Sequence, residues 1–261
     1  MIYTKPLIEV RILRRYKRFL ADVYAPGLLV GADAIAHEAC PPGHVAFMVH
    51  CANPGGMHGL VVAHNRAWLF DSENPKRKLR YSLELLETPS GALVCVNTNR
   101  ANALVGEALE QGEIRDLVGF HFKPEVVWGI GEHKSRFDFA FYFEPERQAS
   151  LCGYLEVKSV TYAPDPVHQT GLVAFPDAVT SRGLKHLEAL IQVIAEGKRA
   201  ILCFCANRSD AERVTIAEAI DPNYASGLRR AIQAGVEVIA VKAQTDINEH
   251  RVLKEIPFVF R

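Results

Sequence analysis

Two carboxylates and one ammonium group occur where a pair of strands could bring them together. Glu156 and Lys158 are one residue apart in the apolar run 151–160, so both side chains would lie on one face of a strand. Asp138 lies in the preceding run, 136–143, and hairpin pairing of the two runs would place it beside Glu156. Carboxylates hold hard cations such as Mg²⁺ or Mn²⁺, which polarise a phosphodiester and lower the pKa of bound water. We therefore predict a nuclease-type metal site with Asp138, Glu156 and Lys158 as catalytic residues, in which Lys158 orients the water.

A second interpretation of these residues needs no metal. An isolated Glu-x-Lys is often part of an ion pair on a solvated sheet face. A further carboxylate, Glu107, falls on the helix expected before the strands, where it is either a third metal ligand or a solvated helix residue. The order of the elements favours the metal site. Asp and then Glu-x-Lys on adjacent strands, after a helix and before a helix and a strand, resembles the arrangement of the PD-(D/E)xK nuclease superfamily.

Cations also gather at the start of the helix expected from about residue 182 to 196. Thr180 or Ser181 can cap this helix. A helix start offers backbone N–H donors to phosphate, and Arg182, Lys185 and His186 would add cationic or hydrogen-bonding groups. We predict that Arg182 and Lys185 contact DNA. A capped helix with ordinary solvated charges is the alternative.

A run of cations and aromatic rings near the amino terminus predicts a second contact with DNA. Residues 11–18 contain no acidic side chain. On a barrel face the cations would contact phosphates and the rings would stack on bases. The alternative is a solvated edge strand that discourages aggregation. The run consists of Arg14, Arg15, Tyr16, Lys17, Arg18 and Phe19.

The charge distribution is compatible with a nucleic-acid partner although the net charge is zero. Residues 1–100 hold 12 basic and 8 acidic side chains, a net charge of +4, whereas residues 101–261 hold 18 and 22, a net charge of −4. Local fields rather than the total charge steer a charged partner. The first domain is therefore the expected DNA-binding domain.

Hydrophobic patterning predicts an α/β protein of two domains. Residues 1–96 contain short apolar or alternating runs between turn formers, including a run at 27–36, and this spacing is typical of an OB-fold-like β-barrel. Residues 97–261 change to the order αβββαβαβ, a restriction-endonuclease-like αβββαβ arrangement with a further helix and strand. Asn97 or Thr98 would cap the first helix. The expected elements are helices at about 100–111, 182–196 and 223–233 and strands at 125–128, 136–143, 151–160, 199–205 and 236–241.

The cysteines and the hydropathy exclude several classes of protein. The six cysteines are scattered without a Cys-x-x-Cys pair, which indicates buried free thiols rather than a zinc site. Charged residues interrupt the first 15 residues, so they do not form the apolar core of a signal peptide, and no later run approaches the roughly 20 apolar residues of a membrane span. We expect a cytoplasmic protein without a membrane partner.

Short motifs occur along nearly the whole chain, at 15–22, 51–55, 74–78, 96–98, 135–138, 156–161, 175–180, 182–183, 185–187 and 221–222. Together they resemble the sugar fermentation stimulation protein A (SfsA) family. The resemblance implies an OB-fold-like first domain, a PD-(D/E)xK-like second domain, DNA binding without sequence specificity, and a role in regulating sugar (maltose) metabolism. The metal-site pattern of the family falls on Asp138, Glu156 and Lys158. One loop differs, because residues 52–57 read Ala-Asn-Pro-Gly-Gly-Met where many relatives have Pro-Asn-Thr-Gly-Ser-Met.

Two hypotheses about function remain open at this point. In the first, the chain is a metal-dependent DNA endonuclease whose first domain holds the strand that the second domain cuts. In the second, it is a non-catalytic DNA-binding regulator that retains a nuclease fold. DNA binding is common to both.

Overall fold

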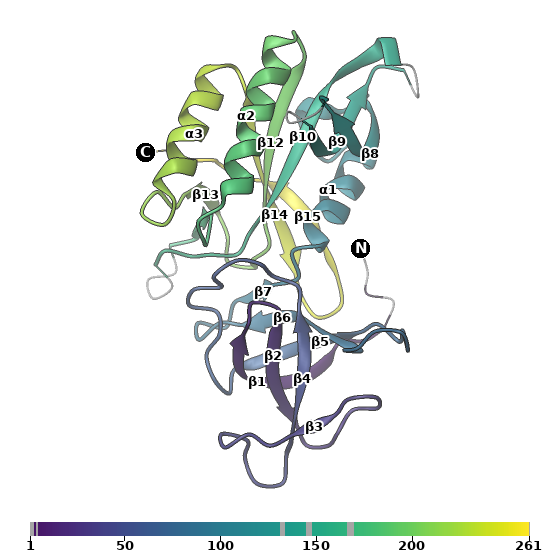
Figure 1. Cartoon of the computed structure of the whole chain (residues 1–261), viewed down its shortest axis with the longest axis vertical. Coiled ribbons are helices and arrows are strands. Elements are labelled where there is room, and N and C mark those ends of the chain that lie inside the picture. The colour runs from purple at the N-terminus through teal and green to yellow at the C-terminus, as the bar shows by residue number, and fades with distance from the viewer. Residues whose placement is uncertain (1–2, 4, 131–133, 145–147, 166–169, 261) are drawn as a thin grey trace.

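The computed structural model describes residues 3, 5–130, 134–144, 148–165 and 170–260, which form two lobes (Figure 1). A β-barrel occupies the lower lobe in that view, and a sheet flanked by helices occupies the upper lobe. In this described part, no helix is both long and apolar enough to cross a membrane.

The barrel confirms the OB-fold-like architecture expected for the first domain. Its strands have the order β3-β4-β2-β1-β5-β6-β7, and parallel pairing of β4 with β6 closes the barrel. Alternate side chains fill the interior, among them the fully buried Ile12, Val23 and Phe47. The strands are β1 (Ile8–Tyr16), β2 (Leu20–Ala25), β3 (Ala34–Ile35), β4 (Val45–Cys51), β5 (Arg66–Asp71), β6 (Tyr81–Glu87) and β7 (Leu93–Cys95).

One expected strand of the barrel is nearly absent. The run 27–36 contributes only Ala34–Ile35 as β3. Gly31 has a φ of 75°, a left-handed conformation that a continuous strand does not contain, and Val30 is 77% exposed. The run therefore forms mainly a surface loop, although Leu29 and Ala32 pack against the barrel core.

The second lobe contains a mixed sheet in the order β15-β14-β12-β10-β9-β8. The strands β10, β12 and β14 are parallel to one another, whereas β8 and β9 are antiparallel to their neighbours. This confirms the predicted α/β mixture and adds strands that periodicity did not show. The elements are α1 (Arg100–Glu110), β8 (His121–Trp128), β9 (Ser135–Tyr142), β10 (Leu151–Val160), β11 (Leu172–Phe175), α2 (Ser181–Ala195), β12 (Arg199–Ala206), β13 (Arg213–Ile216), α3 (Pro222–Gln233), β14 (Glu237–Thr245) and β15 (His250–Glu255), with 3-10 turns at Arg115–Leu117 and Gln148–Ser150.

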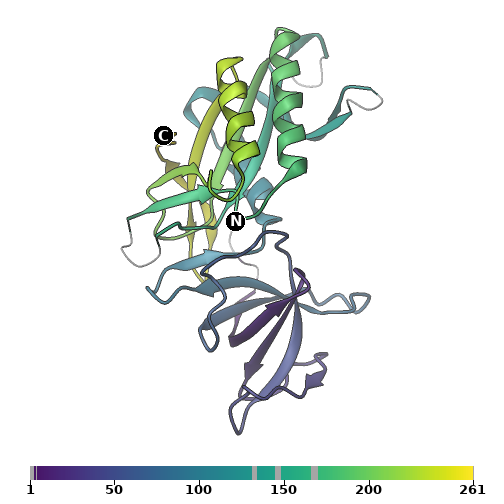
Figure 2. The same ribbon diagram turned by 60° about the vertical axis from the view of Figure 1, so that its left-hand side comes forward.

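Helices cover both faces of this sheet. The helices α2 and α3 lie side by side on one face (Figure 2), and α1 packs on the other. Strand β10 alternates accordingly, since Tyr154 packs toward α2 and α3 while Leu155 and Val157 pack toward α1. The six cysteines are free thiols, as predicted. Four of them are buried, including Cys203 and Cys205 on the α1 side, whereas Cys40 and Cys152 are only half-buried.

Local chemistry explains where two of the helices begin. The hydroxyl of Thr180 accepts the N–H of Gly183, as predicted for the start of α2. The carboxylate of Asp221 accepts the N–H of Tyr224, and Pro222 opens α3. A side chain at residue 183 would lie 2.8 Å from Thr180, so the glycine permits this tight start.

The predicted caps of α1 are wrong. Asn99 takes the cap position without a side-chain hydrogen bond. Asn97 instead donates to the buried carboxylate of Glu84, and the hydroxyl of Thr98 donates to the carbonyl of Ala52. Both side chains join the helix start to the barrel, and this long-range use prevents them from capping.

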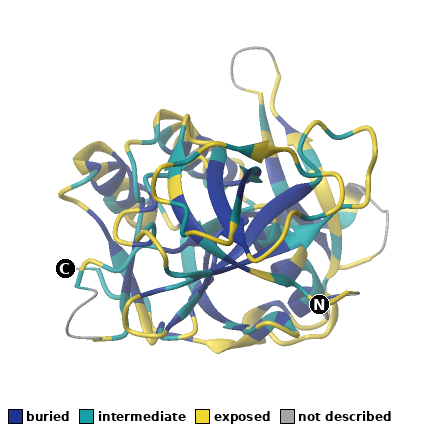
Figure 3. Cartoon of the chain, turned by 90° about the horizontal axis from the view of Figure 1, so that it is seen from below, coloured by how far each residue is buried: buried dark blue, intermediate teal, exposed yellow. Residues whose placement is uncertain are grey.

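Hydrogen bonds join the two lobes at several points. The edge strand β7 bonds to the segment after β12, with Cys95 N donating to Asn207 O at 2.9 Å. A barrel loop meets the segment before α2, where Met57 N donates to Asp177 Oδ2 at 3.0 Å. Seen from the barrel end, buried strands occupy the centre of the molecule and exposed loops surround them (Figure 3). The barrel therefore lies against the segment that leads into α2.

Candidate metal and nucleic-acid site

Asp138 occupies the point where β9 and β10 part. Their antiparallel pairing, which confirms the expected hairpin, ends at Phe139 opposite Leu155. Beyond that pair, Val157 N donates to Asp138 Oδ2 at 2.7 Å, and Asn102 of α1 donates to Asp138 Oδ1 at 2.6 Å. The carboxylate thus replaces a missing strand partner and joins the hairpin to α1.

The strand alternation is interrupted at Asp138. Phe137 packs on the α2 side of the sheet and Phe139 on the α1 side, although the two are only two residues apart. Asp138 therefore reaches into the gap between the strands instead of standing on the same face as Glu156. The two carboxylates nevertheless interact, because burial and then the charge of Glu156 raise the pKa of Asp138 to about 6.

Glu156 is the most buried carboxylate of the group, with 3% of its surface exposed. Its Oε1 accepts from Lys158 Nζ at 2.6 Å and from His186 Nδ1 of α2. Its Oε2 is buried and has no hydrogen-bond partner among the described residues. Burial acts to raise the pKa of Glu156, but Lys158 and His186 together outweigh burial and hold the pKa below its ordinary value.

The role of His186 differs from the one that the sequence suggested. The sequence favoured a contact between this residue and phosphate, but the imidazole is buried against Glu156. Arg182 Nε donates to His186 Nε2 at 3.4 Å, so the ring proton lies on Nδ1, where it can be donated to Glu156. In the sequence, the adjacent Lys185 and His186 at the start of the helix were the only indication that His186 has a functional role. Arg182 and Lys185 themselves are exposed, as a contact with DNA requires.

Glu107 and Asp138 line one small hollow of about 360 Å³ beside α1. Glu110 and Glu125 also line it, whereas Glu156 does not. Among the described residues, no group of three or more His, Cys, Asp or Glu side chains is arranged to hold a metal ion. The structure therefore places Glu107 in the same hollow as Asp138, whereas Glu156 lies outside this hollow and is hydrogen-bonded to Lys158.

The basic run of the first domain folds into the β1–β2 hairpin, where most of its members have partners. Arg14 Nε donates to Asp22 Oδ2 at 2.7 Å, and the hydroxyl of Tyr16 donates to Asp22 Oδ1 at 3.0 Å. Asp22 itself is fully buried. This carboxylate neutralises one of the four cations from across the hairpin, a contact that depends on strand register and was missed in the sequence.

Arg15 stabilises a loop, and the tip of the hairpin is exposed. The guanidinium of Arg15 donates to the carbonyls of Asn53 and Gly55 at 2.7 and 2.8 Å. Lys17 and Arg18 turn the chain with φ values of 48° and 61°, and both are exposed. The next residue, Phe19, is 48% exposed. The tip therefore offers two cations and one ring to a partner, and Arg14, although paired with Asp22, is exposed as well.

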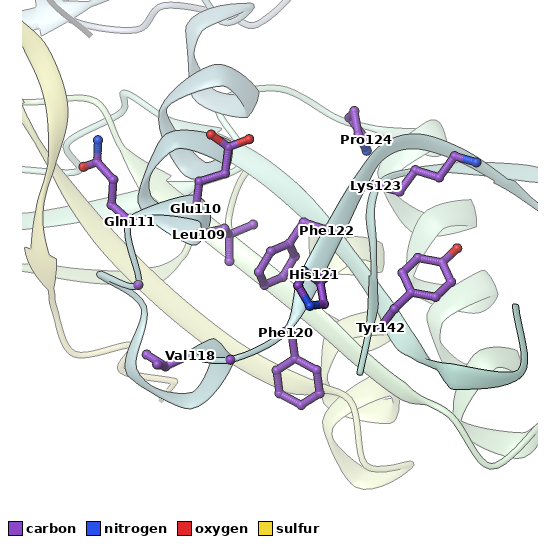
Figure 4. Close-up of a pocket in the computed structure, with 12 residues that line it drawn as sticks. Leu109, Glu110, Gln111, Val118, Phe120, His121, Phe122, Lys123, Pro124 and Tyr142 are labelled. Atoms are coloured by element: carbon purple, nitrogen blue, oxygen red, sulfur yellow. The ribbon is translucent and has the colours of Figure 1, made fainter. Parts of the chain in front are cut away.

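A larger hollow of about 910 Å³ lies along the edge strand β8 (Figure 4). His121, Lys123 and Tyr142 line it together with the end of α1, and it contains neither Asp138 nor Glu156. It shares Glu110 and Pro124 with the smaller hollow that Glu107 and Asp138 line, so the two hollows adjoin. This hollow is thus a neighbour of the carboxylates rather than their site.

Comparisons with known proteins agree with this architecture. Residues 13–96 match the family model described as the SfsA N-terminal OB domain, and residues 99–249 match the sugar fermentation stimulation protein RE domain. A sugar fermentation stimulation protein homolog of Teredinibacter turnerae is 43% identical, covering 99% of this chain and 100% of the relative. One from Pseudomonas aeruginosa is 42% identical, covering 98% and 99%.

A solved structure also matches over almost the full length of both chains. It is described as the structure of Pyrococcus furiosus SfsA in complex with Ca²⁺, and it covers 99% of this chain and 98% of that chain with a TM-score of 0.78. The two sequences are 21% identical, so this likeness concerns the fold.

Proposed function

The chain belongs to the SfsA family, and we propose that it is a DNA-binding protein with a Mg²⁺- or Mn²⁺-dependent nuclease site at Asp138, Glu156 and Lys158. One observation carries the proposal. Glu156 Oε2 is buried without a partner, although Oε1 of the same carboxylate accepts from Lys158 and His186. An unsatisfied carboxylate oxygen in a protein interior is costly, and a divalent cation would satisfy it.

The residues present fit a magnesium-type ion. Such an ion keeps several waters and is usually held by one or two carboxylates together with phosphate oxygens of the substrate, so Asp138 and Glu156 suffice. A cation would also relieve the repulsion that contributes to the raised pKa of Asp138. The solved structure of Pyrococcus furiosus SfsA, described as a complex with Ca²⁺, supports a hard cation in this fold. Glu107, which lines the same hollow as Asp138, would be a further ligand in this proposal.

Each residue of the site has a distinct task in this proposal. When bound, the ion would polarise the phosphodiester and lower the pKa of a water. Lys158 Nζ, with 13% of its side chain exposed, would donate to the attacking water and to developing negative charge on the phosphate. His186 holds Glu156 from the α2 side, and Arg182 fixes the tautomer of His186.

DNA binding in this proposal is directed to phosphates and is therefore independent of sequence. Lys17, Arg18 and Phe19 at the hairpin tip would contact one part of the strand, and Arg182 and Lys185 another. The contact between the barrel loop and the segment before α2 keeps these two regions in fixed relation. The names of the relatives, and the resemblance to their family, extend the proposal to a role in the regulation of sugar (maltose) metabolism.

A second candidate is a non-catalytic DNA-binding regulator that retains the nuclease fold. One observation favours it, namely that the described residues include no group of three or more potential metal ligands. The two candidates share DNA binding and differ in cleavage.

The deciding experiment incubates the pure protein with supercoiled, linear and single-stranded DNA in Mg²⁺, Mn²⁺ or EDTA. We expect binding under all three conditions and cleavage only with a metal. Glu156→Gln should bind DNA but not cut it. Binding without cleavage in either metal would favour the non-catalytic candidate, and absence of binding would refute both.

A further inference from the structure

We propose that a cationic hollow between the start of β9 and the first turns of α2 binds a phosphate group of a nucleic-acid strand. The hollow measures about 430 Å³, and its charged lining is Lys134, Arg136, Arg182, Lys185 and Glu188. This inference rests on the proposed DNA-binding function and specifies a phosphate subsite within it.

The charge balance of the cationic hollow favours an anion. Four cations line it against one carboxylate. Within the described part of the chain, Arg182 and Lys185 form no ion pair, and Arg136 pairs with Glu125 at 2.9 Å where both side chains are largely exposed. A pair so exposed contributes little and can exchange its partner. A phosphate entering the hollow would therefore meet a local excess of positive charge.

The packing of the lobe holds the two walls of the hollow in place. Phe137, one residue after Arg136, packs into the core beneath α2. The ring of Trp128 on β8 donates from Nε1 to Glu196 Oε2 at 3.1 Å, beyond the last turn of α2. Arg182 and Lys185 are three residues apart and so share one face of the helix. Arg136, Arg182 and Lys185 are thus presented from two packed elements, and Lys134 directly precedes β9.

His186 separates the cationic hollow from the metal site. The residue lines the hollow and also bonds to Glu156, whereas Glu156 and Lys158 do not line it. A phosphate in the hollow would lie near the metal site without being the phosphate that is cut. The hollow would therefore hold a neighbouring phosphate and fix the strand for in-line attack. A guanidinium offers paired donors to phosphate oxygens and an ammonium offers a point charge, so Arg182 and Lys185 can act together.

A phosphate at this position comes either from within a strand or from its end. A terminal monoester carries up to about two negative charges near neutral pH, so it would gain more from four cations than an internal diester. The test therefore compares single-stranded oligonucleotides that carry a 5′-phosphate, a 3′-phosphate or only hydroxyl ends.

The experiment measures fluorescence anisotropy over a series of salt concentrations in EDTA. For a single strand, each lost phosphate contact lowers the slope of log affinity against log salt by about 0.7, so the double variant Arg182→Ala with Lys185→Ala should lose about 1.4. Lys185→Ala alone should lose about 0.7 and leaves the bond between Arg182 and His186 intact. Arg182→Lys with Lys185→Arg should retain the slope. The matched control is Arg213→Ala with Arg230→Ala, two exposed cations outside the hollow.

The outcomes separate this inference from the proposed function. A lower slope in both alanine variants supports the subsite, and a preference of the wild type for one phosphorylated end, lost in the variants, identifies a terminal phosphate. Wild-type binding with slopes unchanged in both alanine variants would overturn the subsite while DNA binding stands. No binding by the wild type would refute the DNA-binding function together with the subsite. Since no metal is present, a failure to cleave DNA affects neither result.

Discussion

Replacing Asp138 by Asn should stabilise the metal-free protein at neutral pH. Burial and the charge of Glu156 raise the pKa of Asp138 from 3.8 to about 6 in the folded state. The folded protein therefore holds this proton more tightly than the unfolded chain, and stability falls as the pH rises from 3.8 to about 6 and then stays lower. A pKa difference of about two units corresponds to about 3 kcal/mol of folding free energy. This is the largest stabilisation that a neutral side chain at position 138 could provide.

The hydrogen bonds around position 138 reduce the stabilisation expected from Asp138→Asn but do not reverse it. The new amide oxygen can still accept from Val157 N, which takes its hydrogen bond from Asp138 in the wild type. The new NH₂ group would face the NH₂ of Asn102, so the amide of Asn102 must turn over to offer its oxygen. We expect Asp138→Asn to melt several degrees above the wild type at pH 7.5 in EDTA, since about 1 kcal/mol shifts Tm by about 2–4 °C in a domain of this size.

Binding of a metal ion should instead stabilise the wild type relative to Asp138→Asn. At a free-ion concentration about 100 times Kd, binding adds about 2.7 kcal/mol to the wild type and nothing to a variant that cannot bind. Thermal unfolding by circular dichroism at pH 5, 6 and 7.5, with and without Mn²⁺, gives both quantities. Asp33→Asn, at an exposed carboxylate of the barrel, is the control. If Asp138→Asn melts below the wild type at pH 7.5 in EDTA, the account of Asp138 is refuted.

Three further predictions concern single features of the structure. Lys158→Ala should bind Mn²⁺ by calorimetry yet lose DNA cleavage, because its proposed partner is the attacking water; retained cleavage would contradict this. Lys17→Ala with Arg18→Ala should lower the salt slope of duplex binding by about one unit per lost contact, whereas Arg14→Ala should lower it less because Arg14 is already paired. Equal slopes for the two variants would argue against the tip as the contact. Gly55→Ala would place a methyl group 2.1 Å from a carboxylate oxygen across the lobe interface, so Tm should fall by an amount equivalent to about 1–3 kcal/mol; an unchanged Tm would show that this contact is loose.

Periodicity was sufficient to locate the regular part of the second domain. The run predicted at 151–160 is strand β10, and its two-residue repeat placed Glu156 and Lys158 on one face, where the structure shows them hydrogen-bonded. The cap at Thr180 was found from local chemistry alone. These features depend on residues close in sequence, which is why they could be predicted.

Features that depend on distant residues could not be predicted. Asp22 neutralises Arg14 only because the hairpin register places them together, so counting acids within residues 11–18 overstated the free charge. Asn97 is recruited by the buried Glu84 and therefore does not cap α1. The break in alternation at Asp138 likewise follows from packing on both sides of the sheet.

The most direct test of the central claim is calorimetric titration of Mn²⁺ into the protein bound to a duplex with non-hydrolysable linkages, because the duplex supplies any phosphate ligands that the site requires. The comparison is between the wild type and Glu156→Gln, which keeps an oxygen for Lys158 but removes the charge from Oε2, the atom that lacks a partner. We predict saturable binding by the wild type and none at this site in the variant. Equal binding by both proteins, or binding by neither, would contradict a metal-dependent nuclease site at these carboxylates.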